Sequence, residues 1–142
     1  MSDIINTRSA PAPVGAYPHA RRMGNLLFLS GVGPRQPGSG DIPGNVYATD
    51  GHLLSHDIAA QCTQVFANVR AILQASGAAW QDLIDVTVFL TDMPADFAVY
   101  NDLYAEHFAG VDACRTTVGV SALPTPIAIE LKCIAMLPAP EG

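Results

Sequence analysis

The amino-acid sequence predicts an α+β fold in which one mixed β-sheet packs against two helices in a two-layer sandwich. Two segments show the 3.6-residue spacing of apolar side chains that is typical of amphipathic helices. The other apolar segments are short, rich in β-branched residues and bounded by glycine or proline, as strands are. The chain has 142 residues, so we expect a single domain over residues 1–142.

The N-terminal part is predicted to contribute strands and a long loop. Residues 2–16 begin polar and are then interrupted by prolines, which indicates a short edge strand followed by a loop. The apolar run GNLLFLSG, residues 24–31, predicts a strand. Residues 32–51 are dense in Gly, Pro, Asp and Asn and predict a long irregular stretch, which is usually functional or part of an interface. A short strand is expected within residues 52–57.

Two helices and another strand are predicted in the middle of the chain. Apolar residues share one helix face over residues 57–75, and Gly77 is suited to end that helix. Alternating apolar residues predict a strand over residues 82–92. A second helix is expected over residues 94–110, with Pro94 near its first position.

The last two predicted strands carry an arginine and a glutamate that could form a catalytic pair. Residues 115–123 and 127–137 are joined by Pro-Thr-Pro, so we expect them to pair as antiparallel neighbours. Alternation places Glu130 on the sheet face opposite the apolar positions of its strand. With the two side chains close together, the Arg115 guanidinium could hold a substrate carboxylate while the Glu130 carboxylate activates a water molecule. An exposed cross-strand ion pair is the alternative, and the residue types alone leave both open.

Composition excludes several classes of function. The net charge is −6 with only seven Lys and Arg residues, so no nucleic-acid partner is expected. The three cysteines are widely spaced, which indicates reduced thiols in a cytoplasmic protein. No apolar run reaches membrane-spanning length, so no membrane partner is expected. His52 and His56 lie four residues apart but lack a nearby third ligand, so we predict surface histidines and no metal site.

Several motifs together resemble the RidA/YjgF family of enamine and imine deaminases. They cover nearly the whole chain and read APAPVGAYPHA, GNLLFLSG, ANVRAILQASG, DVTVFLTDM, DFAVYNDLYAEHF, CRTTVGVSALP and AIELKCIAML. The last two motifs are the most specific. The resemblance implies a chorismate-mutase-like sandwich that forms a homotrimer, or a hexamer of two trimers, with an inner barrel of sheets and active sites between subunits. Burial of apolar surface between subunits would explain why only 14% of the residues are charged.

The resemblance also implies a role for each candidate site residue. Arg115 would hold the α-carboxylate of the substrate, and Glu130 would position and activate the water that adds to the imine carbon. Tyr17 matches the tyrosine of an N-terminal loop that lines the cleft, while Ser30 and Asn101 match positions that border it. No metal or organic cofactor is expected.

Departures from the family pattern narrow the expected substrate. The family's GPYSQA is GAYPHA here, which places His19 where an amide is usual, and the longer loop after LSG adds Arg35. These features are similar to the branch of the family that converts 2-aminomuconate to 4-oxalocrotonate and ammonia in bacterial aromatic catabolism. A dicarboxylate enamine needs an anchor beyond Arg115, and His19 or Arg35 could supply it.

Other readings of the same motifs stay open. His19 and Arg35 could equally be an ordinary loop histidine and a solvated arginine. A general deaminase of 2-aminoacrylate and 2-iminopropanoate is an alternative to the 2-aminomuconate function. A non-catalytic protein of the family that binds small carboxylates is a third reading, although the presence of both Arg115 and Glu130 argues against it.

Overall fold

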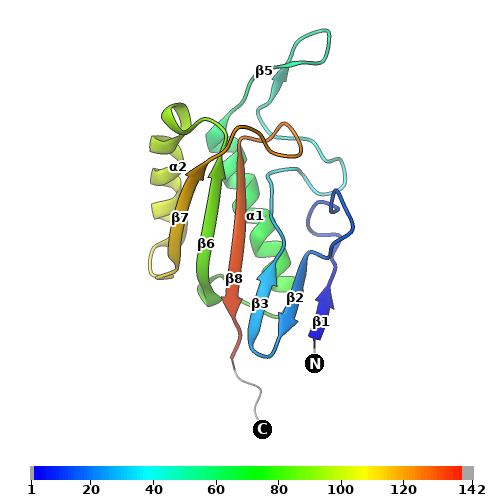
Figure 1. The fold of residues 1–142 in the computed structure, drawn as a ribbon, viewed down its shortest axis with the longest axis vertical. Helices are drawn as coiled ribbons and strands as arrows, with labels where there is room; N and C mark the ends of the chain where they lie inside the picture. The colour runs from blue at the N-terminus through cyan, green and yellow to red at the C-terminus, as the bar shows by residue number, and fades with distance from the viewer. Residues whose placement is uncertain (1, 139–142) are drawn as a thin grey trace.

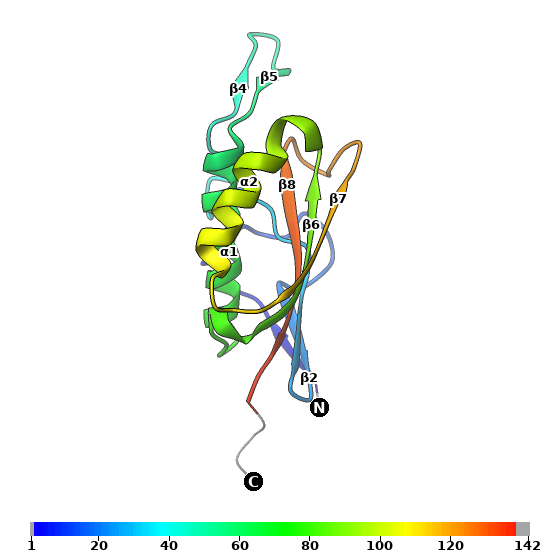
Figure 2. The ribbon, with the colours of Figure 1, turned by 90° about the vertical axis from the view of Figure 1, so that its left-hand side faces the viewer.

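In the computed structural model, which describes residues 2–138, a single mixed sheet carries both helices on one face (Figures 1 and 2). Its strands lie in the order β1-β2-β3-β8-β6-β7. Their bounds are β1 Ser2–Ile5, β2 Ala20–Met23, β3 Leu26–Leu29, β6 Leu83–Leu90, β7 Cys114–Gly119 and β8 Ile129–Met136. The predicted two-layer α+β fold is confirmed.

Both helices begin at an aspartate that caps the first turn. α1 spans Ile58–Ala75, and the Asp57 carboxylate accepts a backbone hydrogen bond of 3.1 Å from its first turn. α2 spans Met93–Phe108 and is capped in the same way by Asp92 at 3.2 Å. Gly77 follows α1 with a φ of +76°, a conformation that favours glycine and ends the helix. Neither helix of the described residues is long and apolar enough to cross a membrane.

The core lies between the helices and the inner face of the sheet. Alternate side chains of β6 and β8 are fully buried and pack against the apolar face of α1, which confirms the predicted alternation of the last strand. These side chains are Val86, Val88, Leu90, Leu131 and Cys133 from the sheet, and Cys62, Val65, Phe66 and Val69 from α1. Each fully buried apolar side chain of this size contributes about 1.5–3 kcal/mol to folding.

The predicted pairing of the last two strands is wrong. β6 lies between β7 and β8, parallel to the first and antiparallel to the second. β7 follows α2, so a β-α-β crossover places it beside β6 as a parallel edge strand. The Pro-Thr-Pro connection therefore passes across the end of β6 instead of forming a hairpin.

The structure also contains a hairpin that the sequence did not predict. β4, Val46–Tyr47, lies inside the stretch expected to be wholly irregular and pairs with β5, Leu53–Ser55. A two-residue strand is too short to show a period-two pattern, so β4 leaves no sequence signal. Residues 46–55, here called the arm, project beyond the rest of the chain (Figures 1 and 2).

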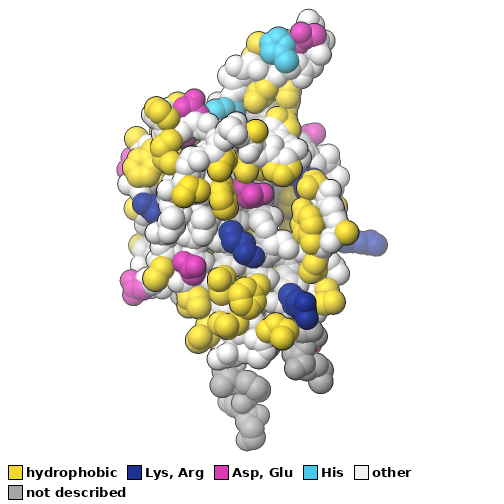
Figure 3. All heavy atoms as spheres, viewed as in Figure 1, with side chains coloured by type: hydrophobic (Ala, Val, Ile, Leu, Met, Phe, Trp, Pro, Cys, Tyr) yellow, Lys and Arg dark blue, Asp and Glu magenta, His cyan; other side chains and the backbone are white. Residues whose placement is uncertain are grey.

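The outer face of the sheet, which we call the open face, has no helix over it in the described residues. Figure 3 views this face and shows hydrophobic side chains gathered over the strands, with isolated charged side chains among them. Three exposed members are Met23, Phe28 and Met136, with exposed fractions of 47%, 37% and 45%. A contiguous apolar surface that is exposed to water is typical of a site at which another molecule binds.

A buried glutamine ties α1 to the start of β8 and to the segment before the arm. The side chain of Gln61 is fully buried, and its Oε1 accepts a hydrogen bond from the Ala128 backbone N–H at 2.8 Å. Its Nε2 donates to Oδ1 of Asn45 at 3.0 Å. One side chain thus satisfies polar groups from two segments that are distant in sequence.

Replacement of Gln61 by leucine should destabilise the fold. Gln61→Leu would leave the buried N–H of Ala128 without an acceptor, so we expect the free energy of unfolding to fall by about 2 kcal/mol. Urea denaturation measures this change. Gln74→Leu, on the exposed side of α1, is the matched control, and equal stability of the two variants would contradict the role assigned to Gln61.

Candidate active site

Glu130 lies on the open face of the sheet, packed against a glycine. A Cβ atom built on Gly31 would be 3.0 Å from the carboxylate carbon of Glu130, so any larger residue would push this carboxylate from its position. Burial raises the pKa of the Glu130 carboxyl above its ordinary value. A carboxylate with a raised pKa is a stronger base, and Glu130 can therefore accept a proton from a bound water molecule.

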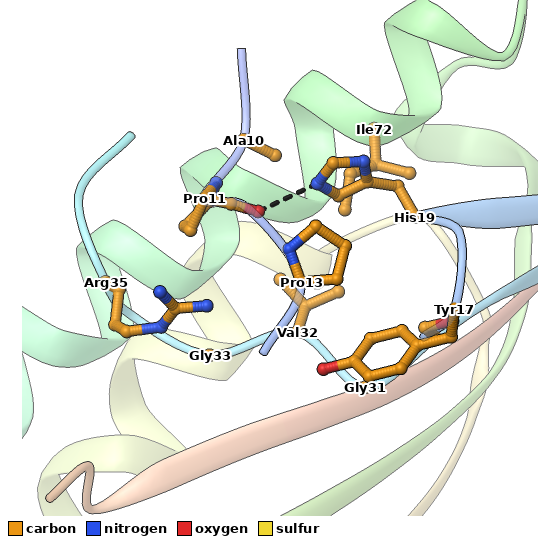
Figure 4. Close-up of a pocket in the computed structure, with 11 residues that line it drawn as sticks. Ala10, Pro11, Pro13, Tyr17, His19, Gly31, Val32, Gly33, Arg35 and Ile72 are labelled. Atoms are coloured by element: carbon orange, nitrogen blue, oxygen red, sulfur yellow. Dashed lines mark hydrogen bonds between the residues drawn. The ribbon is translucent and has the colours of Figure 1, made fainter. Parts of the chain in front are cut away.

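Two small adjoining cavities connect Glu130 with the N-terminal loop. The first has a volume of about 50 Å³ and is lined by Glu130, Tyr17 and Arg35, among others. The second, of about 40 Å³, is lined by Tyr17 and Arg35 together with His19 and Ser30. Figure 4 shows the Tyr17 ring and the Arg35 guanidinium approaching the second cavity from opposite ends. Five of the seven predicted site residues therefore lie around one region.

His19 is a structural residue of this region. Its ring is 8% exposed; Nδ1 accepts a hydrogen bond from the Thr7 N–H at 3.2 Å, and Nε2 lies 2.8 Å from the Pro11 carbonyl oxygen (Figure 4). Because Nδ1 is an acceptor, the proton sits on Nε2 and is donated to Pro11. His19 thus fastens the N-terminal loop, and neither ring nitrogen is free to bind a substrate carboxylate.

Ser30 and Arg35 each donate a side-chain hydrogen bond to the N-terminal loop, but only Arg35 has further N–H donors for a ligand. The Ser30 hydroxyl donates to the Pro18 carbonyl oxygen at 2.7 Å. Nη2 of Arg35 donates to the Ala12 carbonyl oxygen, also at 2.7 Å. A guanidinium has five N–H donors, so Arg35 keeps donors and its positive charge for a ligand in the cavity.

Arg115 and Asn101 form a second cluster at the edge of the sheet. Nη1 of Arg115 donates to Oδ1 of Asn101 at 2.9 Å. The guanidinium carbon lies 4.7 Å from the ring centre of Tyr104 and 5.4 Å from that of Tyr100. These aromatic rings of α2 attract the cation and fix its position. Arg115 remains exposed and can bind a carboxylate.

Within one copy of the chain, the sheet separates Arg115 from Glu130. Arg115 is paired with Val86, which faces the core and the helices. Glu130 is paired with Phe89, whose side chain lies on the open face. Paired residues of neighbouring strands share a face, so the two charged side chains point to opposite sides of the sheet. One copy alone cannot present both groups to one small substrate.

The remaining polar clusters do not form a metal site. In residues 2–138, no group of three His, Cys, Asp or Glu side chains is placed to hold a metal ion. His52 is exposed and contacts Asp50 in the turn of the arm. His56, which we expected at the surface, is instead partly buried, and its Nε2 lies 2.7 Å from the buried carboxylate of Asp96.

Comparison with known proteins identifies the family of the chain. A family model described as "Endoribonuclease L-PSP" matches residues 7–137. The chain belongs to the RidA/YjgF family. A RutC family protein of Pyrococcus horikoshii is 41% identical over 135 residues, which cover 95% of this chain and 98% of that protein. The motif resemblance described above is thereby confirmed.

Two further members of the RidA/YjgF family support the assignment. A 2-iminobutanoate/2-iminopropanoate deaminase of Escherichia coli is 35% identical over 139 residues, covering 96% of this chain and 98% of the relative. The crystal structure of YyfA, a Rid family protein of unknown function from Yersinia pestis, has a TM-score of 0.83 and 31% identity. That match covers 96% of this chain and 100% of YyfA.

Sequence reasoning missed two residues of the Glu130 cavity. Gly31 and Thr125 line it with Glu130. Gly31 is the last residue of the segment predicted as a strand, and a glycine there is a signal of close approach by another group. Thr125 lies in the Pro-Thr-Pro connection, whose path across the sheet became clear only with the strand order.

The raised pKa of Glu130 predicts a pH-dependent stability difference. The folded state holds the Glu130 proton more tightly than the unfolded chain, so stability falls as the pH rises from the ordinary carboxyl pKa of the unfolded chain to the higher pKa of the folded state. The variant Glu130→Gln lacks this loss. It should be more stable than the unmodified protein near pH 7, and the difference should shrink toward pH 4 as the carboxyl becomes protonated in both states.

Urea denaturation at the two pH values measures the effect of Glu130→Gln. Glu106→Gln, on the exposed side of α2, controls for the loss of one negative charge from an acidic chain. A loss of stability in Glu130→Gln near pH 7 would contradict the desolvation of this carboxylate.

Proposed function

We propose that this RidA/YjgF protein hydrolyses 2-imino acids, and the enamines in equilibrium with them, to 2-oxo acids and ammonia. The observation that carries the proposal is the partly desolvated Glu130 carboxylate, held by Gly31 at a small cavity. The deaminase relative of Escherichia coli, which is named for 2-iminobutanoate and 2-iminopropanoate, supports short 2-imino acids as the substrate class.

The reaction requires one carboxylate that handles protons and one cation that holds the substrate. A water molecule bound to Glu130 attacks C2 of the imine, and Glu130 accepts the proton that the water loses. Glu130 then returns this proton to the nitrogen, which gives a carbinolamine with an amino group and a hydroxyl group on C2. Glu130 next transfers the hydroxyl proton to the amino group; the C–N bond breaks as the C=O bond forms, and the products are a 2-oxo acid and ammonia. Arg115 binds the carboxylate next to C2 and orients the imine carbon toward the water.

The site is proposed to form between two copies of the chain in a homotrimer. Arg115 and Glu130 lie on opposite faces of one sheet, so Arg115 of one copy must meet Glu130 of another. The open apolar face offers surface that packing of three sheets into a barrel would bury. A hexamer of two such trimers would keep the same sites.

A dicarboxylate such as 2-aminomuconate is the second candidate substrate. The Arg35 guanidinium lines the Glu130 cavity and adds a cation at a distance from Arg115. That cation could bind a distal carboxylate, whereas His19 has no free ring nitrogen for this role. The general 2-imino acid function is the main proposal because the named relative acts on short substrates.

RNA cleavage, the activity in the description of the family model, fits this chain less well. RNA binding depends on Lys and Arg side chains that neutralise phosphates, and this chain has a net charge of −6. Lys132, the single lysine, donates to the carbonyl oxygen of Leu29 in the neighbouring strand. The cations beside Glu130 and at the sheet edge are single arginines, which suit a small carboxylate.

Ammonia release tests the proposed reaction directly. With 2-iminobutanoate generated in place by an amino-acid oxidase, the purified protein should accelerate ammonia release. Glu130→Gln should lower kcat by at least about 100-fold with a small change in KM, because it removes the proton acceptor. Arg115→Ala should lower kcat/KM through a higher KM. No acceleration by the unmodified protein, or full activity of Glu130→Gln, would refute the proposal.

Mixing of the two impaired variants, at a substrate concentration at which each alone has little activity, tests whether the site joins two copies. When Arg115→Ala and Glu130→Gln copies are unfolded and refolded together, about a quarter of the sites in random trimers unite an intact Arg115 with an intact Glu130. We therefore expect about a quarter of the unmodified rate of ammonia release. Each variant refolded alone is the control. A mixed sample as inactive as its two components would show that both residues act within one copy.

A further inference from the structure

A larger groove at the base of the arm lies next to the Glu130 cavity. This groove has a volume of about 510 Å³. Arg35 and Thr125 line both the groove and the Glu130 cavity, so the two spaces meet at these side chains. Tyr47, the last residue of β4, forms part of the far wall, and Asp41 lies along the groove. A ligand bound at Glu130 can thus extend past Arg35.

The junction of the two spaces is rich in hydrogen-bond donors. Arg35 uses one donor on the Ala12 carbonyl oxygen and keeps the others. The Tyr47 hydroxyl oxygen accepts a hydrogen bond from Asn45 at 3.1 Å, so its own proton is free to be donated. Thr125 adds a second hydroxyl. One cation and two hydroxyls favour a carboxylate or another anionic acceptor, and Asp41 disfavours a second anion further along the groove.

The far wall of the groove is held in place by three hydrogen bonds of Asn45. Nδ2 of Asn45 donates to the Pro126 carbonyl oxygen at 2.9 Å as well as to the Tyr47 hydroxyl. Oδ1 of Asn45 accepts from the buried Gln61 at 3.0 Å. Asn45 therefore couples the first strand of the arm to α1 and to the Pro126 segment. A wall fixed in this way can orient a ligand without a large loss of entropy.

We propose that this groove binds the side chain of longer substrates, and that among 2-imino acids with an extended side chain the protein prefers those that end in an anionic group. The terminal group would contact Arg35, Thr125 and Tyr47, while the imine carbon lies at Glu130. The inference rests on the proposed deaminase function, because Glu130 sets the position of the imine. It assigns a role in substrate selection to Tyr47 and thus to the arm.

Three substrates of graded length and charge test the groove. They are 2-iminobutanoate, 2-iminohexanoate and 2-iminoadipate, each generated in place by an amino-acid oxidase. We expect kcat/KM to be at least about tenfold higher for 2-iminoadipate than for 2-iminohexanoate, because only the former carries a terminal carboxylate. Arg35→Gln should reduce this ratio about tenfold, and Tyr47→Phe should reduce it about threefold.

Two comparisons distinguish a specific effect of a substitution on the groove from a general effect on folding. Because the ratio compares 2-iminoadipate with 2-iminohexanoate on the same variant, a loss of folding or of the Glu130 site that affects both substrates alike cancels from it. Arg8→Gln removes an exposed arginine that lines neither space, and it should leave the ratio unchanged. A ratio near one in the unmodified protein, or one unaffected by Arg35→Gln, would overturn the inference while leaving the proposed function intact.

A binding measurement keeps the groove testable if the proposed reaction fails. Absence of ammonia release from all three substrates would refute the deaminase function. Calorimetric titration with 2-oxoadipate and 2-oxohexanoate would then examine the groove alone. Tighter binding of 2-oxoadipate that is lost in Arg35→Gln would support an anion-binding groove, and equal binding of the two acids would overturn it.

Discussion

The parallel pairing of β6 with β7 is the constraint on which the rest of the structure depends. It makes β7 an edge strand, and it turns Arg115 toward α2 while Glu130 on β8 faces the open side. Because side chains alternate strictly between the two faces of a sheet, no local adjustment brings the two groups together. The opposite face stays open because both helices lie on one side of the sheet (Figure 2), and in the proposed trimer the packing of further copies would cover this face and unite the divided site.

Local features of this fold were readable from the sequence, whereas spatial neighbours were not. The helix at 57–75 and the outward position of Glu130 follow from apolar periodicity, which depends only on nearby residues. The strand order depends on the crossover through α2, and the short Pro-Thr-Pro link misleadingly resembled a hairpin turn. The motifs also indicated the family, because they combine residues from the whole chain.

The same holds for the candidate site: the sequence indicated which residues belong to it, but not which groups surround each of them in the folded chain. Sequence motifs named Tyr17, Ser30, Arg35 and Glu130, and the structure gathers them around adjoining cavities. The sequence could not show that both ring nitrogens of His19 are occupied, since Thr7 and Pro11 approach it only in the folded chain. Arg35 and His19 were therefore equivalent candidates until their hydrogen bonds were known.

Arg115 and Glu130 lie on opposite faces of the sheet, and this placement has a consequence for the genetics of defective alleles. In the proposed trimer, each copy supplies its arginine to one site and its glutamate to another. A defective copy that lacks both groups yet still folds and assembles would disable two of the three sites of any trimer that contains it. Such an allele would act dominantly over a normal one, whereas an allele whose product fails to fold would be recessive.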